Sequence, residues 1–481
     1  MRVLIFSFLL FFNSSFASFD MNERMEKTYE HIINLRFEFA NTLLELEEIE
    51  NNQNRIIALH KNYIDFLKLL ISEDEEYYNI SKNKKKERIA FIQKGNKESP
   101  YYLYAQGEIY LQWSFIYLKN KEYTSFVYDF IRSYNLFDAN AKKFPKFALN
   151  KKGLSIIYTL LGAVPKQYEW MLDLIGMKGD IKTGLLNMEQ VLHNNELKIY
   201  QQEVLFIIAF LQLNLTNDDQ INHKYLSIIG DRYKSNILLN FAAARLSHSL
   251  GMNEYCIEIL ENRPQEKGIY PFYYLDYLQA ISYLYKLDYY TSRLYFERFI
   301  KYFEGENYIK SAYHKLACIA YLEDNKGYKT YFESVIKEGN SFIDEDKVSL
   351  KYAKIGDLGS PLLLKARLLY DGGYYQQALD VISEFKVRDN AEYYYRLASI
   401  QEKLNYTNED VIFNYKQAYN LAFASDDYYA PMSSLRIALL YEYQLDFKKA
   451  DSYFNKCLSF SDFDYQRGIH QQAKAGLERV N

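Results

Sequence analysis

Residues 361–385, PLLLKARLLYDGGYYQQALDVISEF, decide the fold because two apolar helical patterns meet there at a short Gly-Gly break. Ala366 in the first pattern and Ala378 in the second stand twelve positions apart. Small side chains at such positions let two antiparallel helices approach closely, since the distance between helix axes depends on the residues at the contact. Ile382 and Phe385 then fill the far side of the second helix. The stretch predicts one antiparallel helix hairpin.

The same arrangement of small residues recurs along the C-terminal part of the chain. The segment around Ala317 is the poorest match, because Lys329 stands where a small residue is expected. The other pairs are Ala438 with Ala450, Ala280 with Ser292, Ala244 with Cys256 and, one residue out of step, Ala398 with Val411. A hairpin that is repeated in this way predicts a solenoid of stacked units.

The first-helix anchors, from Ala244 to Ala438, are separated by 36, 37, 49, 32 and 40 residues. These spacings cluster around about 34 residues, the length of a tetratricopeptide repeat, and the larger ones imply insertions. Residues 235–460 resemble the tetratricopeptide repeat family, which implies an all-α, right-handed solenoid of antiparallel helix hairpins. Strand-like alternation is nowhere sustained, and the polar helical pattern of residues 464–480 predicts a helix that caps the last repeat.

The N-terminal portion is helical without a clean repeat. Residues 21–51 read as one long amphipathic helix, residues 55–78 as a second helical run, and residues 99–144 as a long hairpin that carries Trp113. The predicted organisation is therefore a signal peptide at 1–17, an N-terminal helical region at 18–200, and repeats with a C-terminal capping helix at 201–481.

The first residues, MRVLIFSFLLFFNSSFASFD, have the layout of a secretory signal peptide: Arg2, an apolar run at 3–12, and small residues at Ser15 and Ala17. The apolar run is shorter than the roughly 20 residues that span a bilayer. We expect cleavage after Ala17 and a soluble mature chain, exported to the periplasm or secreted, with no membrane span. The Lys, Asn, Ile and Tyr bias fits an AT-rich bacterium.

Motifs that carry chemistry are absent. The formal net charge is -4 with acids and bases mixed along the chain, so a nucleic-acid partner is not expected. The histidines have no metal-binding spacing, and GxSxG, Walker and GxGxxG patterns do not occur. Cys256, Cys318 and Cys457 fall at apolar helical positions and read as small buried residues. We predict no catalytic residue, no cofactor, no metal site and no enzymatic activity.

Residues 151–192 contain a group of closely spaced glycines. They resemble the signature stretch of the tetratricopeptide repeat protein 39 family, which includes the yeast inclusion-body-clearance protein; this resemblance implies architecture and an adaptor role. The matching positions are Gly153, Gly162, Pro165, Gly176, Gly179, Asp180 and Gly184. A phosphate cradle at the following helix is one interpretation. Asp180, however, is a good N-cap whose side chain would take those N–H donors, so we interpret the segment as a structural junction.

The tyrosine content, 49 of 481 residues, suits either helix packing or a binding groove, and composition does not separate the two. We expect a scaffold or adaptor of the cell envelope that binds a protein or peptide in the groove of the solenoid. The alternative is a capture protein for glycans or small molecules with a Tyr-rich pocket. The Asn and Lys pattern by which some tetratricopeptide domains grip a C-terminal carboxylate is absent. The predicted groove residues are Phe241, Arg245, His248, Tyr274, Tyr277, Arg367, Tyr370, Tyr395 and Glu402.

Overall fold

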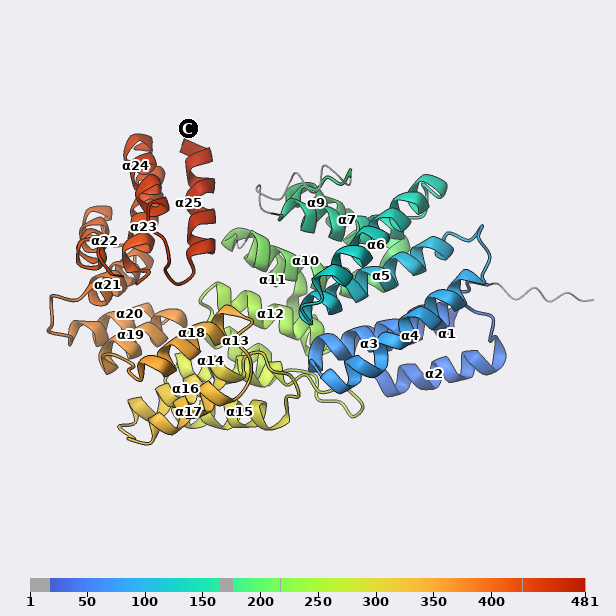
Figure 1. Ribbon diagram of the computed structural model, residues 1–481, viewed down its shortest axis with the longest axis horizontal. Helices are drawn as coiled ribbons and strands as arrows, with labels where there is room; N and C mark the ends of the chain where they lie inside the picture. Colours follow the sequence, from blue (N-terminus) through green and yellow to red (C-terminus); the bar gives the residue numbers. More distant parts are fainter. Residues whose placement is uncertain (1–17, 165–175, 217, 426, 481) are drawn as a thin grey trace, which may run out of the picture. The chain divides into compact units, whose positions relative to one another are not determined.

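The computed structural model describes residues 18–164, 176–216, 218–425 and 427–480, and every regular element in these ranges is a helix (Figure 1). The chain forms two compact units, Met1–Ala242 with Arg263–Pro271, and Ala243–Asn262 with Phe272–Asn481. The division falls inside α12 (Ile237–Ser249), so residues 201–242 belong to the first unit. Residues 1–17, where the signal peptide is predicted, lie outside the described residues.

The helices of the first unit pack mainly on their neighbours in sequence. They are α1 (Glu23–Ile33), α2 (Phe37–Glu50), α3 (Ile56–Ser72), α4 (Glu75–Gln93), α5 (Tyr101–Lys119), α6 (Tyr123–Lys143), α7 (Leu149–Gly162), α9 (Ile181–Leu192), the 3₁₀ helix η2 (Asn195–Tyr200), α10 (Gln201–Leu215), α11 (Asp219–Ile229) and the 3₁₀ helix η3 (Gly230–Lys234). The predicted hairpin at 99–144 is confirmed as α5 and α6, with Trp113 buried.

The prediction of one long helix at 21–51 is wrong. The chain turns between α1 and α2, where Leu35 adopts a positive φ of 55°. The backbone N–H groups of Asn34 and Arg36 donate to the last carbonyls of α1, on Glu30 and His31, and so cap that helix. The periodicity continued through the turn because a leucine, which carries no turn signal, occupies the left-handed position.

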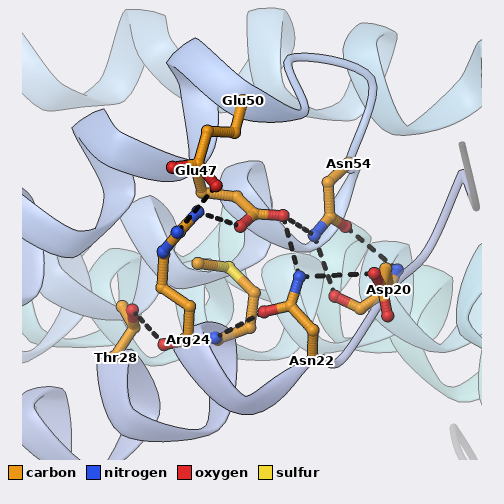
Figure 2. A network of polar contacts seen from close by, with 8 residues as sticks. Asp20, Asn22, Arg24, Thr28, Glu47, Glu50 and Asn54 are labelled. Carbon is orange, nitrogen blue, oxygen red and sulfur yellow. Dashed lines mark hydrogen bonds and ion pairs between the residues drawn. The ribbon is translucent and has the colours of Figure 1, made fainter.

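A polar network anchors the start of the first unit (Figure 2). The buried Glu47 carboxylate accepts hydrogen bonds from Asn22 Nδ2 at 3.0 Å and Asn54 Nδ2 at 2.8 Å, and it pairs with Arg24 at 3.0 Å. The Asp20 backbone N–H donates to Asn54 Oδ1 at 3.0 Å. This carboxylate therefore joins the segment before α1, the body of α2 and the connection to α3.

The second unit is built from helix hairpins. Its helices after α12 are α13 (Asn253–Glu261), α14 (Tyr274–Tyr285), α15 (Tyr289–Tyr302), α16 (Ile309–Leu322), α17 (Tyr328–Lys337), α18 (Asp344–Ile355), α19 (Pro361–Asp371), α20 (Tyr375–Ser383), α21 (Ala391–Lys403), α22 (Asn408–Ala422), α23 (Tyr429–Tyr443), α24 (Phe447–Leu458) and α25 (Gln466–Val480). The pairs α14/α15, α16/α17, α19/α20, α21/α22 and α23/α24 pack closely. The predicted all-α, tetratricopeptide-like architecture is confirmed.

The small-residue anchors lie where the two helices of a hairpin touch. All six first-helix anchors, Ala244 to Ala438, are completely buried. Ser292 Oγ donates to the backbone carbonyl of Ala280 at 2.8 Å, and Cys256 Sγ to that of Ala244 at 3.4 Å. The residue twelve positions on therefore reaches the anchor's own backbone, an approach that only small side chains allow. The three cysteines are buried and unpaired, as predicted.

Departures from the regular repeat also have a structural account. The longest anchor spacing, 49 residues, contains the additional helix α18, which packs against α16 and α17. Lys329, at the imperfect position of that hairpin, is exposed, and Phe332 and Val335 fill its core. The predicted capping helix is α25, which packs on α23 and α24. No helix in the described ranges is long and apolar enough to cross a membrane.

Candidate functional site

Consecutive first helices of the second unit are joined by polar side chains that stand 34 residues apart. His248 Nε2 lies 2.7 Å from Ser282 Oγ, and Tyr277 OH lies 2.8 Å from Ser311 Oγ. Glu402 accepts hydrogen bonds from Arg436, again 34 residues on. These contacts follow the repeat length, because equivalent positions of neighbouring repeats lie side by side in a stacked array. We call the surface formed by the first helices α12, α14, α16, α19, α21 and α23 the first-helix face.

Tyr274 and Tyr277, predicted to line a groove, are packed into the interior of this face. Their side chains are only 9% and 5% exposed, and their rings stack with centroids 5.5 Å apart. Tyr308, at the start of α16, covers both rings at 4.7 and 5.0 Å. Truncating either side chain would therefore disturb the core, so neither residue is a clean probe of binding.

The other predicted residues on α12 are also engaged. Arg245 donates to the Tyr274 hydroxyl at 3.0 Å. Burial, and then the charge of Arg245, lower the pKa of His248 to about 4, so this imidazole is neutral near pH 7. Phe241 lies in the first unit, where its ring contacts that of Phe206 at 6.2 Å. Phe241 thus contacts a residue of the first unit, although it lies on the same helix as Arg245 and His248.

Arg367, Tyr370, Tyr395 and Glu402 are partly exposed on the first-helix face. Tyr370 packs against Tyr375, with ring centroids 5.4 Å apart. The ring of Tyr395 contacts those of Tyr415, Tyr428 and Tyr429 at 5.5 to 6.0 Å. Glu402 accepts a hydrogen bond from Tyr415 OH at 2.8 Å in addition to those from Arg436. This part of the face is a half-buried surface of tyrosines and paired charges.

Sequence reasoning missed Lys315, a half-buried residue of α16 on the same face. Burial, and then the like charge of Arg367, lower the pKa of this ammonium group. A register signal was available: Lys315, Arg396 and Arg436 each stand two positions before the alanine anchor of their repeat. These three residues thus share one register position on their first helices.

A second polar cluster lies at the centre of the first unit. Lys152 of α7 is 1% exposed, and its Nζ lies 2.7 Å from Tyr63 OH, 2.9 Å from Glu203 Oε2 and 3.1 Å from Glu108 Oε2. Burial lowers the pKa of this lysine, but the two carboxylates outweigh burial and leave the pKa raised. Lys152 therefore remains charged and joins α3, α5, α7 and α10. We call these four residues the Lys152 cluster.

An aromatic cavity adjoins the Lys152 cluster. Its volume is about 10 Å³, and its lining includes Tyr29, His60, Tyr63, Tyr101, Tyr104 and Tyr200. A volume of this size holds about one water molecule. Burial lowers the pKa of His60 to about 3, so its ring is neutral. The cavity cannot admit a sugar ring, and the tyrosines around it pack the core of the first unit.

Gly162, Gly179 and Gly184 lie where α7 and the start of α9 meet. A Cβ atom on Gly184 would stand 2.1 Å from Thr159 Oγ1, and one on Gly179 would stand 2.5 Å from the backbone nitrogen of Gly162. A Cβ on Gly162 would stand 2.5 Å from the backbone nitrogen of Ile181. The two helices thus approach backbone to backbone, which leaves no room for a ligand between them.

The remaining positions of this segment act locally. A Cβ on Gly153 would stand 2.4 Å from the ring of Phe137, and Gly176 has a φ of 67°. Asp180 is the N-cap of α9, where its Oδ1 accepts a hydrogen bond from the Thr183 backbone N–H at 2.7 Å. Its carboxylate thus already occupies the start of α9. Pro165, which the same interpretation places in this junction, lies outside the described residues.

Comparison with known proteins finds distant matches among solved structures. No protein-family model and no curated protein sequence matches the chain. The Naa15/Naa10 complex bound to HypK-THB aligns at 12% identity over 95% of this chain and 65% of the matched chain, just under two thirds of its length, with a TM-score of 0.24. The Cut9–Hcn1 hetero-tetramer of APC/C aligns at 12% identity over 95% of this chain and 96% of the matched chain, with a TM-score of 0.23. Yeast Tom70 aligns at 15% identity over 86% of this chain and 96% of the matched chain, with a TM-score of 0.21.

At these TM-scores the class of the protein rests on its own hairpins. Buried alanine anchors, hydrogen bonds across twelve residues and contacts across 34 residues define a tetratricopeptide-like helical repeat protein. Among the described residues, no group of three or more His, Cys, Asp or Glu side chains is arranged to hold a metal ion.

Proposed function

We propose that this chain is a non-enzymatic scaffold of the cell envelope that binds a protein or peptide partner on the first-helix face of its second unit. The observation that carries the proposal is the half-buried surface of tyrosines and charged groups around Arg367, Tyr395 and Glu402. Stacked helix hairpins present such surfaces continuously along the array, and extended segments bind there through backbone and side-chain contacts. Tyrosine suits this role because its ring packs while its hydroxyl donates or accepts hydrogen bonds.

Export of the chain forms part of the same proposal. The signal-peptide pattern places cleavage after Ala17. The chain is bonded into the first unit from the next residue on: the Ser18 carbonyl accepts a hydrogen bond from the Arg55 backbone N–H at 2.9 Å. Cleavage at Ala17 would therefore leave the network around Glu47 intact. The resemblance of residues 151–192 to the tetratricopeptide repeat protein 39 family supports an adaptor architecture and carries no cellular role here.

Burial raises the pKa of all three cysteine thiols. Burial raises the pKa of Cys256 and Cys457 to about 12, so both thiols stay protonated and are poor nucleophiles. The neutral His248 lies 2.7 Å from Ser282 Oγ, and in the part of the chain that the structure describes no carboxylate bonds to its ring to orient it as a base.

Site-specific photo-crosslinking in living bacteria tests the proposal. A photoreactive phenylalanine analogue replaces Tyr465, whose ring contacts Tyr428 of the first-helix face, or Tyr290, an exposed residue of the second helix α15. We expect one discrete crosslinked partner from position 465 and none from position 290. Equal crosslinking at both positions, or none at position 465, would contradict binding on this face. N-terminal sequencing of the exported chain should begin at Ser18.

A further inference from the structure

We infer that a groove on the first unit binds a short neutral oligosaccharide. The groove lies between the N-terminal half of α7 and the C-terminal half of α9, and the connection from α6 to α7 borders it. Its volume is about 450 Å³, within the range of about 300–1,000 Å³ that is usual for small-molecule sites. The inference is independent of the proposed function, because the groove belongs to the first unit and the proposed partner surface to the second.

One face of each helix forms a wall of this groove. Both walls follow the i, i+3, i+4, i+7 pattern of a helix face. The residues are Lys151, Leu154, Ser155 and Tyr158 on α7, and Asn187, Gln190, Val191 and Asn194 on α9 and just after it. A Cβ on Gly184 would stand 2.9 Å from the backbone carbonyl oxygen of Ser155, so the glycine contact between the helices adjoins the groove. The glycines of this segment therefore fix the positions of both walls.

Two amide side chains on the α9 wall have hydrogen-bonding groups free for a ligand. Among the described residues, the half-buried Asn187 side chain has no hydrogen-bond partner. Gln190 Oε1 accepts a hydrogen bond from Lys151 Nζ at 2.7 Å, and Gln190 Nε2 finds no acceptor in the same part of the chain. An amide carries a donor and an acceptor side by side, so it can bond two adjacent hydroxyl groups of a sugar.

The base of the groove is apolar. Val191 and Leu197 line it and are only 2% and 6% exposed. The half-buried ring of Phe147 adds an aromatic surface, held in place by edge contacts with Tyr101 at 5.0 Å and Tyr104 at 5.5 Å. A sugar ring has C–H groups on its faces and hydroxyl groups around its edge. An apolar base with amides on the wall is complementary to both.

The length and charge of the groove favour a sugar over a peptide or an anion. The α7 wall, from Lys151 to Tyr158, spans about 10 Å, since a helix rises about 1.5 Å per residue. An extended peptide would fit only about three residues in this length, and helix walls offer no free backbone edge to bind them. The charged lining residues are Lys146, Lys151 and Glu196, of mixed sign. A ligand that binds through neutral hydrogen bonds suits this lining.

Saturation-transfer difference NMR with the full chain tests the inference. The probes are cellobiose, maltose and N,N′-diacetylchitobiose at millimolar concentration, with an acetylated and amidated Ala-Ser-Ala peptide for comparison. We expect at least one disaccharide to receive saturation, chiefly on its C–H protons, because these would pack on the apolar base. We expect none on the peptide. Saturation of the peptide alone, or of no probe, would overturn the inference.

Isothermal titration calorimetry with variants then places the bound disaccharide. Asn187→Leu and Gln190→Met keep the approximate side-chain volume and remove the amide, and each should weaken binding by about fivefold, the loss expected for one hydrogen bond. Asn83→Leu is the matched control, at an exposed position of α4 in the same unit. It should leave binding unchanged. Circular dichroism checks that each variant is folded, and Gln190, at an exposed position, provides the test if Asn187→Leu is unstable.

The site is wrong if both amide variants bind the disaccharide as tightly as the wild type, or if Asn83→Leu weakens binding equally. The two proposals fail separately. Crosslinking of a partner from position 465 should be unchanged by Asn187→Leu, so loss of the sugar site leaves the scaffold standing. Disaccharide binding that depends on Asn187, without any crosslinked partner, would support the sugar site and contradict the scaffold.

Discussion

Replacing Lys152 with alanine should destabilise the first unit more than any exposed charge substitution. The side chain is 1% exposed, and its ammonium is the cation between Glu108, at 3.1 Å, and Glu203, at 2.9 Å. Removing one partner of a buried ion pair leaves an uncompensated charge and costs roughly 3–5 kcal/mol. Truncating a long side chain also leaves space within the core. We therefore expect the free energy of unfolding of the first unit to fall by roughly 4 kcal/mol.

Tryptophan fluorescence during urea unfolding measures this loss, because Trp113 and Trp170, the two tryptophans of the chain, both fall within residues 1–242. Trp113 is a sensitive probe, since its indole N–H donates to the buried Asn62 Oδ1 at 2.9 Å. Lys151→Ala is the control: Lys151 is the exposed neighbour, bonded to Gln190 at 2.7 Å, and its loss should change stability by less than about 0.5 kcal/mol.

A triple variant separates the charge from the packing. Lys152→Met combined with Glu108→Gln and Glu203→Gln removes all three charges at similar volume, and hydrophobic replacement of buried ion pairs is often nearly neutral. We expect it to recover more than half of the stability lost in Lys152→Ala. A loss below about 1 kcal/mol in Lys152→Ala would refute the reasoning, because a buried charge cannot be left unpaired so cheaply.

Three further predictions concern backbone geometry and pH. Gly184→Ala should lower the free energy of unfolding by more than about 2 kcal/mol, because its Cβ would stand 2.1 Å from Thr159 Oγ1. A Cβ on Gly468 would meet nothing within 4 Å, so Gly468→Ala should raise the free energy of unfolding by up to about 1 kcal/mol through helix propensity. Urea unfolding compares the two variants. Leu445 is 73% exposed and has a φ of 62°, so Leu445→Gly should stabilise the protein by roughly 1 kcal/mol. Gly373→Ala should destabilise it, because the new Cβ would stand 1.9 Å from the Gly251 carbonyl oxygen. Thermal unfolding of both variants checks the sign of each change. Burial raises the pKa of Asp346 from 3.8 to about 6, so the fold favours the protonated carboxyl group. The resulting stability is present below pH 4 and is lost as pH rises through 6, by roughly 2–3 kcal/mol. Asp346→Asn should remove this decline in urea unfolding followed by near-ultraviolet circular dichroism, and an unchanged decline would contradict the assignment.

Particular residues show how much of the fold could be predicted from the sequence. The alanine spacing located the hairpins because two helices that pack closely need a small residue where they cross. The two residues that meet this need lie only about twelve positions apart in the sequence. The split between α1 and α2 was missed because Leu35 takes a left-handed conformation that leucine rarely adopts. The same conformation recurs in the hairpin turns at Leu287 and Leu445, where the surrounding helices impose it.

The candidate site depended more on tertiary packing than on the sequence pattern. Spacing placed Tyr274 and Tyr277 on the correct helix, but Tyr308, about thirty residues away, decides that they are buried. Lys315 was passed over as one more lysine, since its burial depends on how α16 packs. Sequence periodicity indicates which residues share a helix face, and long-range packing decides which of them reach solvent.

By itself, therefore, the sequence determined the all-helical class, the anchors of the hairpins and the helix at the C-terminus, because periodicity and small residues act locally along the chain. Only the tertiary structure decided which charges are buried, paired or available. Lys152 meets Glu108 and Glu203 across separations of 44 and 51 residues, while burial of Lys315 on α16 lowers the pKa of its ammonium group. The electrostatic cost of a charge depends on solvent and partners, and both are set by packing between segments that are distant in the chain.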